Sequence, residues 1–156
     1  MSADVIVVGV DGSTGSLNAL RWALNEGSKW DCPVQIVTAC PTLDVTTSGA
    51  EEMERHASEM QRHALEHVLR DFDTPPAITR EIAHGDAADV LTGKSAAARL
   101  LVVGSHGTYG LRHAGLGSVT DVCLRLTECP AVVVPAEAPR PRHADLVASG
   151  EGDLQT

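Results

Sequence analysis

Five short strand-like segments, four of them largely apolar, alternate with segments of helical periodicity, and this alternation constrains the fold more than any other feature. The largely apolar segments are residues 5–10, 34–39, 100–103 and 131–134, and residues 78–83, ITREIA, form the mixed one. The segments between them, in which apolar residues recur at helical spacing, are residues 14–27, 51–71, 87–98 and 118–127. Short continuous apolar runs are typical of strands buried on both faces. Right-handed strand–helix–strand crossovers then predict a single doubly wound α/β domain, with a five-stranded parallel sheet and helices on both faces.

The composition limits the size, charge and surroundings of this domain. The chain has 156 residues, enough for one domain with a core, and a formal net charge of −9. That charge argues against a general affinity for nucleic acid backbones and anionic membranes. No apolar run approaches the ~20 residues of a transmembrane helix. Four cysteines without CxxC spacing, and a start without a signal-peptide pattern, predict a reduced, cytoplasmic protein.

A change of composition marks the end of the domain. Residues 137–156 are rich in proline, alanine, glycine and charge and contain few large apolar side chains. Such a segment gains too little from burial to offset its ordering entropy. We therefore predict a folded domain over residues 1–136 and a flexible tail over residues 137–156, whose deletion should leave thermal stability nearly unchanged.

The glycine-rich segment 104–119 lies between the fourth predicted strand, residues 100–103, and the last predicted helix. Gly104, Gly107 and Gly117 are expected to reach positive φ and to let the backbone approach a ligand, and Ser118 adds a hydroxyl donor. Free N–H groups at the start of the following helix suit an anion. The spacing differs from both the dinucleotide fingerprint and the P-loop. A flexible connector is the alternative, but the flanking strand and helix favour a phosphate site, which Gly117→Val should abolish without unfolding the chain.

A carboxylate and a glycine occupy matching places in the first and fourth strand regions. Asp11 directly follows the first predicted strand, residues 5–10, and Gly104 directly follows the fourth, residues 100–103. In open doubly wound sheets, ligands bind beyond the carboxyl ends of the strands, where the strand order reverses. If these two strands are neighbours, Asp11 and Gly104 face each other across one crevice. Asp11 then either caps the turn before the next helix or contacts a ligand and its Mg²⁺.

Several segments of the chain resemble the universal stress protein family. They are VGVDGS, SLNALRWA, AHGDAADVL, LLVVGSHG, LGSV and CPAVVVP, and they cover residues 5–135. The ATP-binding branch of that family is marked by Gly-x2-Gly-x9-Gly-[Ser/Thr], and the segment 104–118 fits this pattern without insertion. The resemblance implies strand order 3-2-1-4-5, binding of ATP, and homodimers paired through the last strand.

The resemblance also assigns roles to individual residues. Asp11 matches the carboxylate near the ribose hydroxyls and the bound Mg²⁺, directly or through water. Ala39 matches the position whose backbone recognises adenine. The residues that match the phosphate-contacting groups are Gly104, Gly107, Gly117, Ser118 and Val119. Most contacts to the nucleotide are then expected to come from the main chain.

The function that these features predict is an ATP-binding regulatory protein of the universal stress type. Its nucleotide state would control a dimer surface or a surface for a protein partner that the sequence does not identify. The chain supplies a phosphate cradle but no recognisable general base or nucleophile, so efficient catalysis is not expected. The alternatives are a slow ATPase or nucleotidyl-transfer enzyme on the same fold, and an interaction protein whose crevice holds no nucleotide.

Three histidines and two residues of the glycine-rich segment remain as weaker candidates. His56, His63 and His67 fall on one stripe of the second predicted helix. Their spacing can bind a metal, but HALEH lacks the glutamate position of HExxH, so solvated side chains are favoured. Arg112 and His113 either lean toward the phosphates or are solvated.

Overall fold

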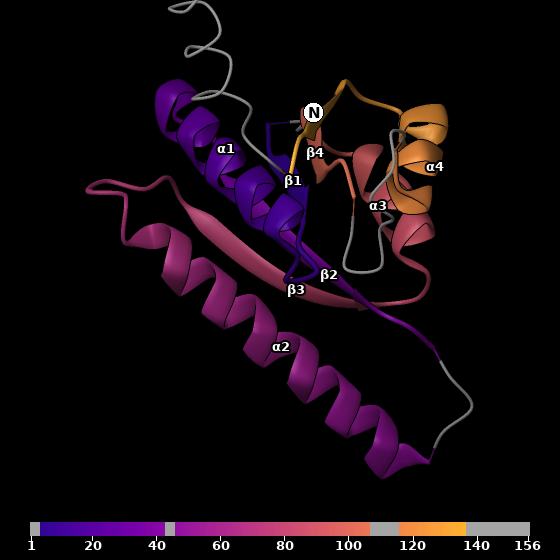
Figure 1. Cartoon of the computed structure of the whole chain (residues 1–156). Helices are drawn as coiled ribbons and strands as arrows, with labels where there is room; N and C mark the ends of the chain where they lie inside the picture. The colour runs from indigo at the N-terminus through magenta and orange to yellow at the C-terminus, as the bar shows by residue number, and fades with distance from the viewer. Residues whose placement is uncertain (1–3, 43–45, 107–115, 137–156) are drawn as a thin grey trace, which may run out of the picture.

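The computed structural model describes residues 4–42, 46–106 and 116–136. Within these ranges the chain forms one five-stranded sheet with helices on both faces (Figure 1). The predicted tail, residues 137–156, lies outside the described residues, as do Gly107, Arg112 and His113. No helix in the described ranges combines the length and the apolar character that crossing a bilayer requires.

Strands and helices alternate along the described chain. Their order is β1 (Ile6–Gly9), α1 (Thr14–Trp30), β2 (Val34–Cys40), α2 (Thr47–Leu69), β3 (Ile78–His84), α3 (Ala87–Ser95), β4 (Leu100–Gly104), α4 (Ser118–Leu126) and β5 (Ala131–Val134). The sheet order is β3-β2-β1-β4-β5, and every neighbouring pair is parallel. The predicted fold class and strand order are therefore confirmed.

The core lies on both faces of the central strands. On one face, Val8 of β1 packs with Leu20 and Leu24 of α1 and with Val68 of α2. On the other face, a second cluster joins β1, β2 and β4 to α3 and α4 and includes Leu91. Figure 1 shows the two helical layers, with α1 and α2 on one side of the sheet and α3 and α4 on the other. Because β1 and β4 lie between both layers, their sequences are continuous apolar runs rather than alternating ones.

Hydrogen bonds and burial account for two features of the helices. Asp86 caps α3, since its carboxylate accepts hydrogen bonds from the N–H groups of Ala88 and Asp89. The predicted apolar stripe of α2 faces the sheet, with Ala64 and Val68 buried. Caps of this kind satisfy N–H groups that a helix leaves without an intrahelical partner.

The predicted bounds of three helices are wrong by several residues. α1 continues past Gly27 to Trp30, because that glycine serves a close approach: a Cβ there would lie 2.7 Å from the Cys32 carbonyl oxygen. α2 begins at Thr47 rather than residue 51, since Thr46 caps it within a stretch that looks like a polar loop. α3 ends at Ser95, and the alanines that follow form turns instead of a further helical turn.

Candidate functional site

A pocket opens beyond the carboxyl ends of β1, β2 and β4. This is the point where the strand order reverses, with β2 on one side of β1 and β4 on the other. The pocket is open to solvent at its mouth, and its mostly apolar lining with a few polar groups is typical of a small-molecule site. Its apolar walls include Val10, Val37, Ala39, Leu91, Val103 and Val119. Its polar walls include Asp11, Ser13, Ser16, His106 and Thr120.

Asp11 lies in a tight turn at one side of this pocket. Its Oδ1 accepts hydrogen bonds from the backbone N–H of Ser13 at 2.9 Å and from the Ser13 hydroxyl at 2.6 Å. Gly12 between them has φ +87°, a conformation that favours glycine. Ser13, not Asp11, caps α1 by accepting from the Ser16 N–H. The turn therefore fixes the Asp11 carboxylate at the pocket while another residue performs the capping.

The end of β4 forms the facing side of the pocket. Gly104 lies so close to α1 that a Cβ on it would be 2.7 Å from the carbonyl carbon of Gly15. The Gly104 carbonyl accepts from the Thr120 hydroxyl of α4 at 2.6 Å. The Gly117 N–H donates to the Ser105 carbonyl at 2.8 Å. Both ends of the glycine-rich segment are thus held together by main-chain and hydroxyl contacts.

The expected reason for two of the glycines is wrong. Gly117 has φ −65° and ψ 160°, and it is the N-cap of α4. Gly104 is in β4, and positive φ among the described glycines occurs only at Gly12 and Gly85. Gly104 is required for close packing rather than for its φ. Backbone strain therefore gives no ground for the predicted loss of binding in Gly117→Val.

Most of the predicted site residues gather at this pocket. Those that line it are Asp11, Ala39, Gly104 and Val119. Gly117 and Ser118 immediately precede Val119 and form the start of α4. The sequence did not single out Ser16, His106 or Thr120. In the sequence, the only sign of His106 is its place in the glycine-rich segment, whereas Ser16 and Thr120 look like ordinary helical positions.

The backbone of Ala39 points toward the β1 side of β2. Carbonyls of odd-numbered β2 residues face β1, since Val37 accepts from the Val10 N–H. Those of even-numbered residues face β3, since Cys40 accepts from the Gly85 N–H. The paired part of β1 ends at Gly9, opposite Val37. Ala39 therefore presents its backbone beyond the end of β1, where the pocket begins.

The three candidate histidines of α2 lie away from this pocket. His56, His63 and His67 are exposed on α2. Across residues 4–42, 46–106 and 116–136, no three histidine, cysteine or acidic side chains gather in a way that would hold a metal ion. A Mg²⁺ at Asp11 would have one protein carboxylate, and a nucleotide's phosphates would complete its shell.

A doubly wound α/β domain with an open pocket at its switch point defines the class of this protein. The chain belongs to the universal stress protein family, whose model matches residues 3–135. Universal stress protein Rv2028c of Mycobacterium tuberculosis is 30% identical over 155 residues, which cover 96% of this chain and 56% of that protein. A universal stress protein of Mycolicibacterium smegmatis is 32% identical over 139 residues, covering 83% and 47%. The chain thus spans about half the length of these relatives.

Solved structures share the fold at low sequence identity. UspA from Lactobacillus plantarum has a TM-score of 0.72 at 19% identity, covering 86% of this chain and 99% of that one. A universal stress protein in complex with cAMP has a TM-score of 0.57 at 24% identity, covering 88% and 100%. A family member from Arabidopsis thaliana with AMP bound has a TM-score of 0.57 at 19% identity, covering 86% and 92%.

Proposed function

We propose that this protein binds an adenine nucleotide, ATP with Mg²⁺ in the first place, and uses it as a regulatory signal in the cytoplasm during stress. The observation that carries the proposal is the convergence of Asp11, Ala39 and the start of α4 on one pocket, although they are far apart in the sequence. The complexes of related folds with cAMP and AMP support the same class of ligand.

The adenine is assigned to the apolar side of the pocket. Val37 and Leu91 offer apolar contact there. Ala39 supplies a backbone N–H and carbonyl from beyond the end of β1. The edge of a purine ring carries an acceptor nitrogen beside further donor or acceptor groups. Two backbone groups can therefore form hydrogen bonds to this edge while apolar walls enclose the ring.

The phosphates are assigned to the start of α4 and the end of β4. Ser118 and Val119 lie in the first turn of α4, whose N–H groups have no intrahelical partner. Gly117 precedes them as the N-cap, and its own N–H is already bound to the Ser105 carbonyl. No lysine or arginine is among the described residues that line the pocket. In this assignment, main-chain N–H groups and Mg²⁺ therefore neutralise the negative charge of the phosphates. Asp11 is the residue that would hold the ion, directly or through water.

A slow ATPase or a nucleotidyl-transfer enzyme is the second candidate. It is favoured by the presence of both a carboxylate, Asp11, and an imidazole, His106, in the pocket wall. Steady-state measurement of phosphate or pyrophosphate release separates the two functions. Many turnovers per protein per minute would establish an enzyme, whereas tight binding with few turnovers supports a nucleotide-controlled regulator.

We also propose that two copies pair through β5, so that nucleotide state alters a dimer or partner surface. The two edges of the sheet differ in kind. β5 carries only alanine and valine, AVVV, and is half-buried in the single chain. β3 carries Thr79, Arg80 and Glu81 along its length, and charged edge residues discourage strand pairing. β5 is therefore the edge suited to a second copy.

The experiment combines identification of the ligand with a matched pair of variants. Mass spectrometry of the small molecule that copurifies should find an adenine nucleotide, and calorimetry should detect ATP binding with Mg²⁺. Asp11→Asn should weaken binding in Mg²⁺ and have a smaller effect in EDTA. Asp31→Asn is the control, because Asp31 is exposed and caps α1 at the opposite end with φ +53°, which asparagine tolerates. Flat calorimetry with every purine nucleotide would refute the proposal.

A further inference from the structure

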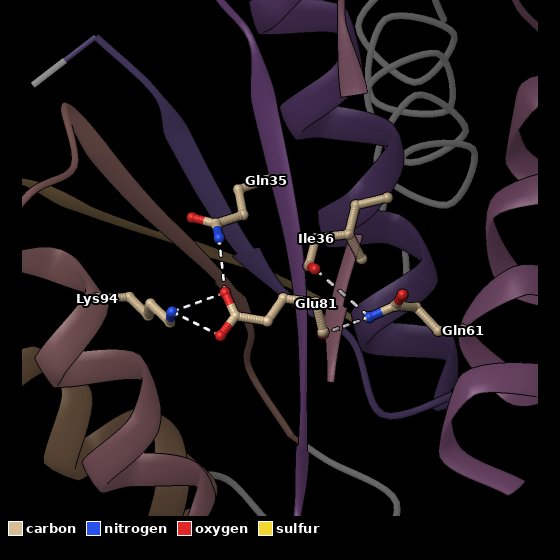
Figure 2. A network of polar contacts seen from close by, with 5 residues as sticks. All are labelled: Gln35, Ile36, Gln61, Glu81 and Lys94. Carbon is tan, nitrogen blue, oxygen red and sulfur yellow. Dashed lines mark hydrogen bonds and ion pairs between the residues drawn. The ribbon is translucent and has the colours of Figure 1, made fainter. Parts of the chain in front are cut away.

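A buried glutamine of α2 connects that helix to the strands beneath it. Gln61 has none of its surface exposed, although it lies in a helix whose other buried residues are apolar. Its Nε2 donates to the Thr38 hydroxyl at 2.9 Å and to the Glu81 carbonyl at 3.1 Å, and lies 3.4 Å from the Ile36 carbonyl. Figure 2 shows Gln61 bonded to the main chain of Ile36 and Glu81, while the Glu81 carboxylate is bonded on its other side to Lys94 and Gln35.

The hydrogen bonds of this cluster form a chain of donors and acceptors from Arg80 through Gln61 and Thr38 to Val10. The Arg80 Nε–H donates to Gln61 Oε1 at 2.9 Å, which fixes the amide so that its NH₂ group faces Thr38. The Thr38 hydroxyl, 4% exposed, accepts from that NH₂ group and donates its single hydrogen to the Val10 carbonyl at 2.7 Å. Arg80 thus orients Gln61, Gln61 orients Thr38, and Thr38 occupies the carbonyl that immediately precedes Asp11.

The Thr38 hydroxyl replaces one backbone hydrogen bond between β1 and β2. Ile6 pairs with Val34 and Gly9 with Val37, so Val10 lies opposite Thr38. The Val10 N–H donates to the Val37 carbonyl at 3.0 Å, as a parallel ladder requires. The next hydrogen bond of the β1–β2 ladder would join the Ala39 N–H to the Val10 carbonyl. Between these two described residues that bond is absent, and the Val10 carbonyl accepts from Thr38 instead.

We propose that Thr38, oriented by Gln61, is a positioning residue that keeps the Ala39 N–H unpaired for the ligand. Because the Thr38 hydroxyl donates to the Val10 carbonyl, the ladder between β1 and β2 ends one hydrogen bond early. The Ala39 N–H is then available at the pocket. An acceptor nitrogen of a purine ring is the partner that this amide would take. The inference rests on the proposed function only for the identity of that ligand. The early end of the ladder is a property of the free protein.

The first test examines the free protein by NMR. In the wild type, the Ala39 amide should exchange with solvent without the protection of a ladder bond, and no scalar coupling should connect it to the Val10 carbonyl. Thr38→Val removes the hydroxyl at nearly constant volume, so the Val10 carbonyl should accept from Ala39. That bond should slow exchange of the Ala39 amide about tenfold. A wild-type Ala39 amide already coupled to Val10 would overturn the inference, whether or not a nucleotide binds.

The second test measures ATP binding by calorimetry. Thr38→Val should raise the Kd for ATP about tenfold, because the amide then has to leave an internal acceptor. Thr38→Ser retains the hydroxyl and should restore the wild-type Kd and the wild-type exchange of the Ala39 amide. Thr38→Ala replaces Thr38→Val if the valine variant does not fold. An unchanged Kd in folded Thr38→Val, with ATP binding to the wild type, would also overturn the inference.

The matched control removes a polar contact to the Glu81 carboxylate, which lies at the other end of the network in Figure 2. Gln35 donates to the Glu81 carboxylate at 2.8 Å, and Lys94 holds the same carboxylate at 2.6 and 2.7 Å. Gln35→Met removes one of these contacts without touching Thr38 or Val10. It should leave both the Ala39 amide and the Kd for ATP unchanged. If Gln35→Met changed them as much as Thr38→Val does, a general loosening of the sheet would replace the specific role of Thr38.

Discussion

Gly15 of α1 and Gly104 of β4 meet backbone to backbone at the pocket. A Cβ on Gly104 would lie 2.7 Å from the Gly15 carbonyl carbon and 2.8 Å from its carbonyl oxygen. A Cβ on Gly15 would lie 2.9 Å from the carbonyl oxygen of His106. This mutual approach places the first turn of α1, and with it the Asp11 turn, against the start of the glycine-rich segment.

Gly104→Ala should disturb this approach and weaken both the fold and the pocket. The added methyl meets backbone rather than a flexible side chain, so α1 has to shift, at a cost of about 1–3 kcal/mol in the free energy of unfolding. Urea denaturation measures that loss, and calorimetry should show weaker ATP binding. The control is Gly93→Ala, since no atom lies within 4 Å of a Cβ at that helical position. Gly93→Ala should gain roughly 0.5–1 kcal/mol, and a similar loss in both variants would contradict the packing argument.

The architecture could be read from the sequence because it depends on pattern. Runs such as residues 5–10 and 100–103 are apolar on both faces, and Asp86 precedes its helix as a capping residue does. The role of Gly104 was misassigned, because a glycine looks the same in sequence whether it serves a positive φ or a close approach. The roles of Gln61 and Thr38 could not be predicted, because each depends on hydrogen bonds that link Gln61, Thr38 and Val10. These residues are far apart in the sequence and form no recognisable motif.

Gly117→Asp should raise the stability of the free protein while lowering its affinity for nucleotide. Gly117 is the N-cap of α4 and makes no side-chain capping bond, and its extended conformation suits aspartate. The cap and the helix dipole should together add about 0.5–1 kcal/mol to the free energy of unfolding. The same carboxylate would repel a bound phosphate. Gly117→Asn is the uncharged control, and it should stabilise α4 with less loss of ATP binding in calorimetry. Equal affinities in the two variants would argue against phosphate at this helix end.

The buried thiol of Cys123 should make stability fall at high pH. Burial, and secondarily the Asp86 carboxylate, raises the pKa of Cys123 to about 11. An unfolded chain with the ordinary thiol pKa of 9.0 loses this proton first, so the unfolded state is favoured as the pH rises from about 9 to 11.

The loss should reach about 2 kcal/mol at pH 11 and should be absent in Cys123→Ala. Denaturant titrations at several pH values measure the difference between the two proteins. Cys129→Ala, at a half-buried cysteine, is the control and should retain the part of the slope that belongs to Cys123. Parallel wild-type and Cys123→Ala stability curves would show that the thiol titrates normally.

Proline substitutions on β5 should separate edge pairing from the fold. The carbonyls of Pro130 and Val134 accept from Leu101 and Ser105, so the backbone groups of even-numbered β5 residues face β4. The Val133 N–H therefore points to the open edge. Val133→Pro should dissociate a β5-paired dimer, since proline removes that donor, while circular dichroism stays native.

Val132→Pro is the matched change on the same strand, and it removes an N–H that faces β4. It should destabilise the fold itself, because a ladder bond inside the sheet is lost. Sedimentation equilibrium and thermal unfolding on both variants distinguish the two effects. A dimer that survives in folded Val133→Pro would have to use another surface, because a strand without this donor cannot continue the sheet across the β5 edge in register.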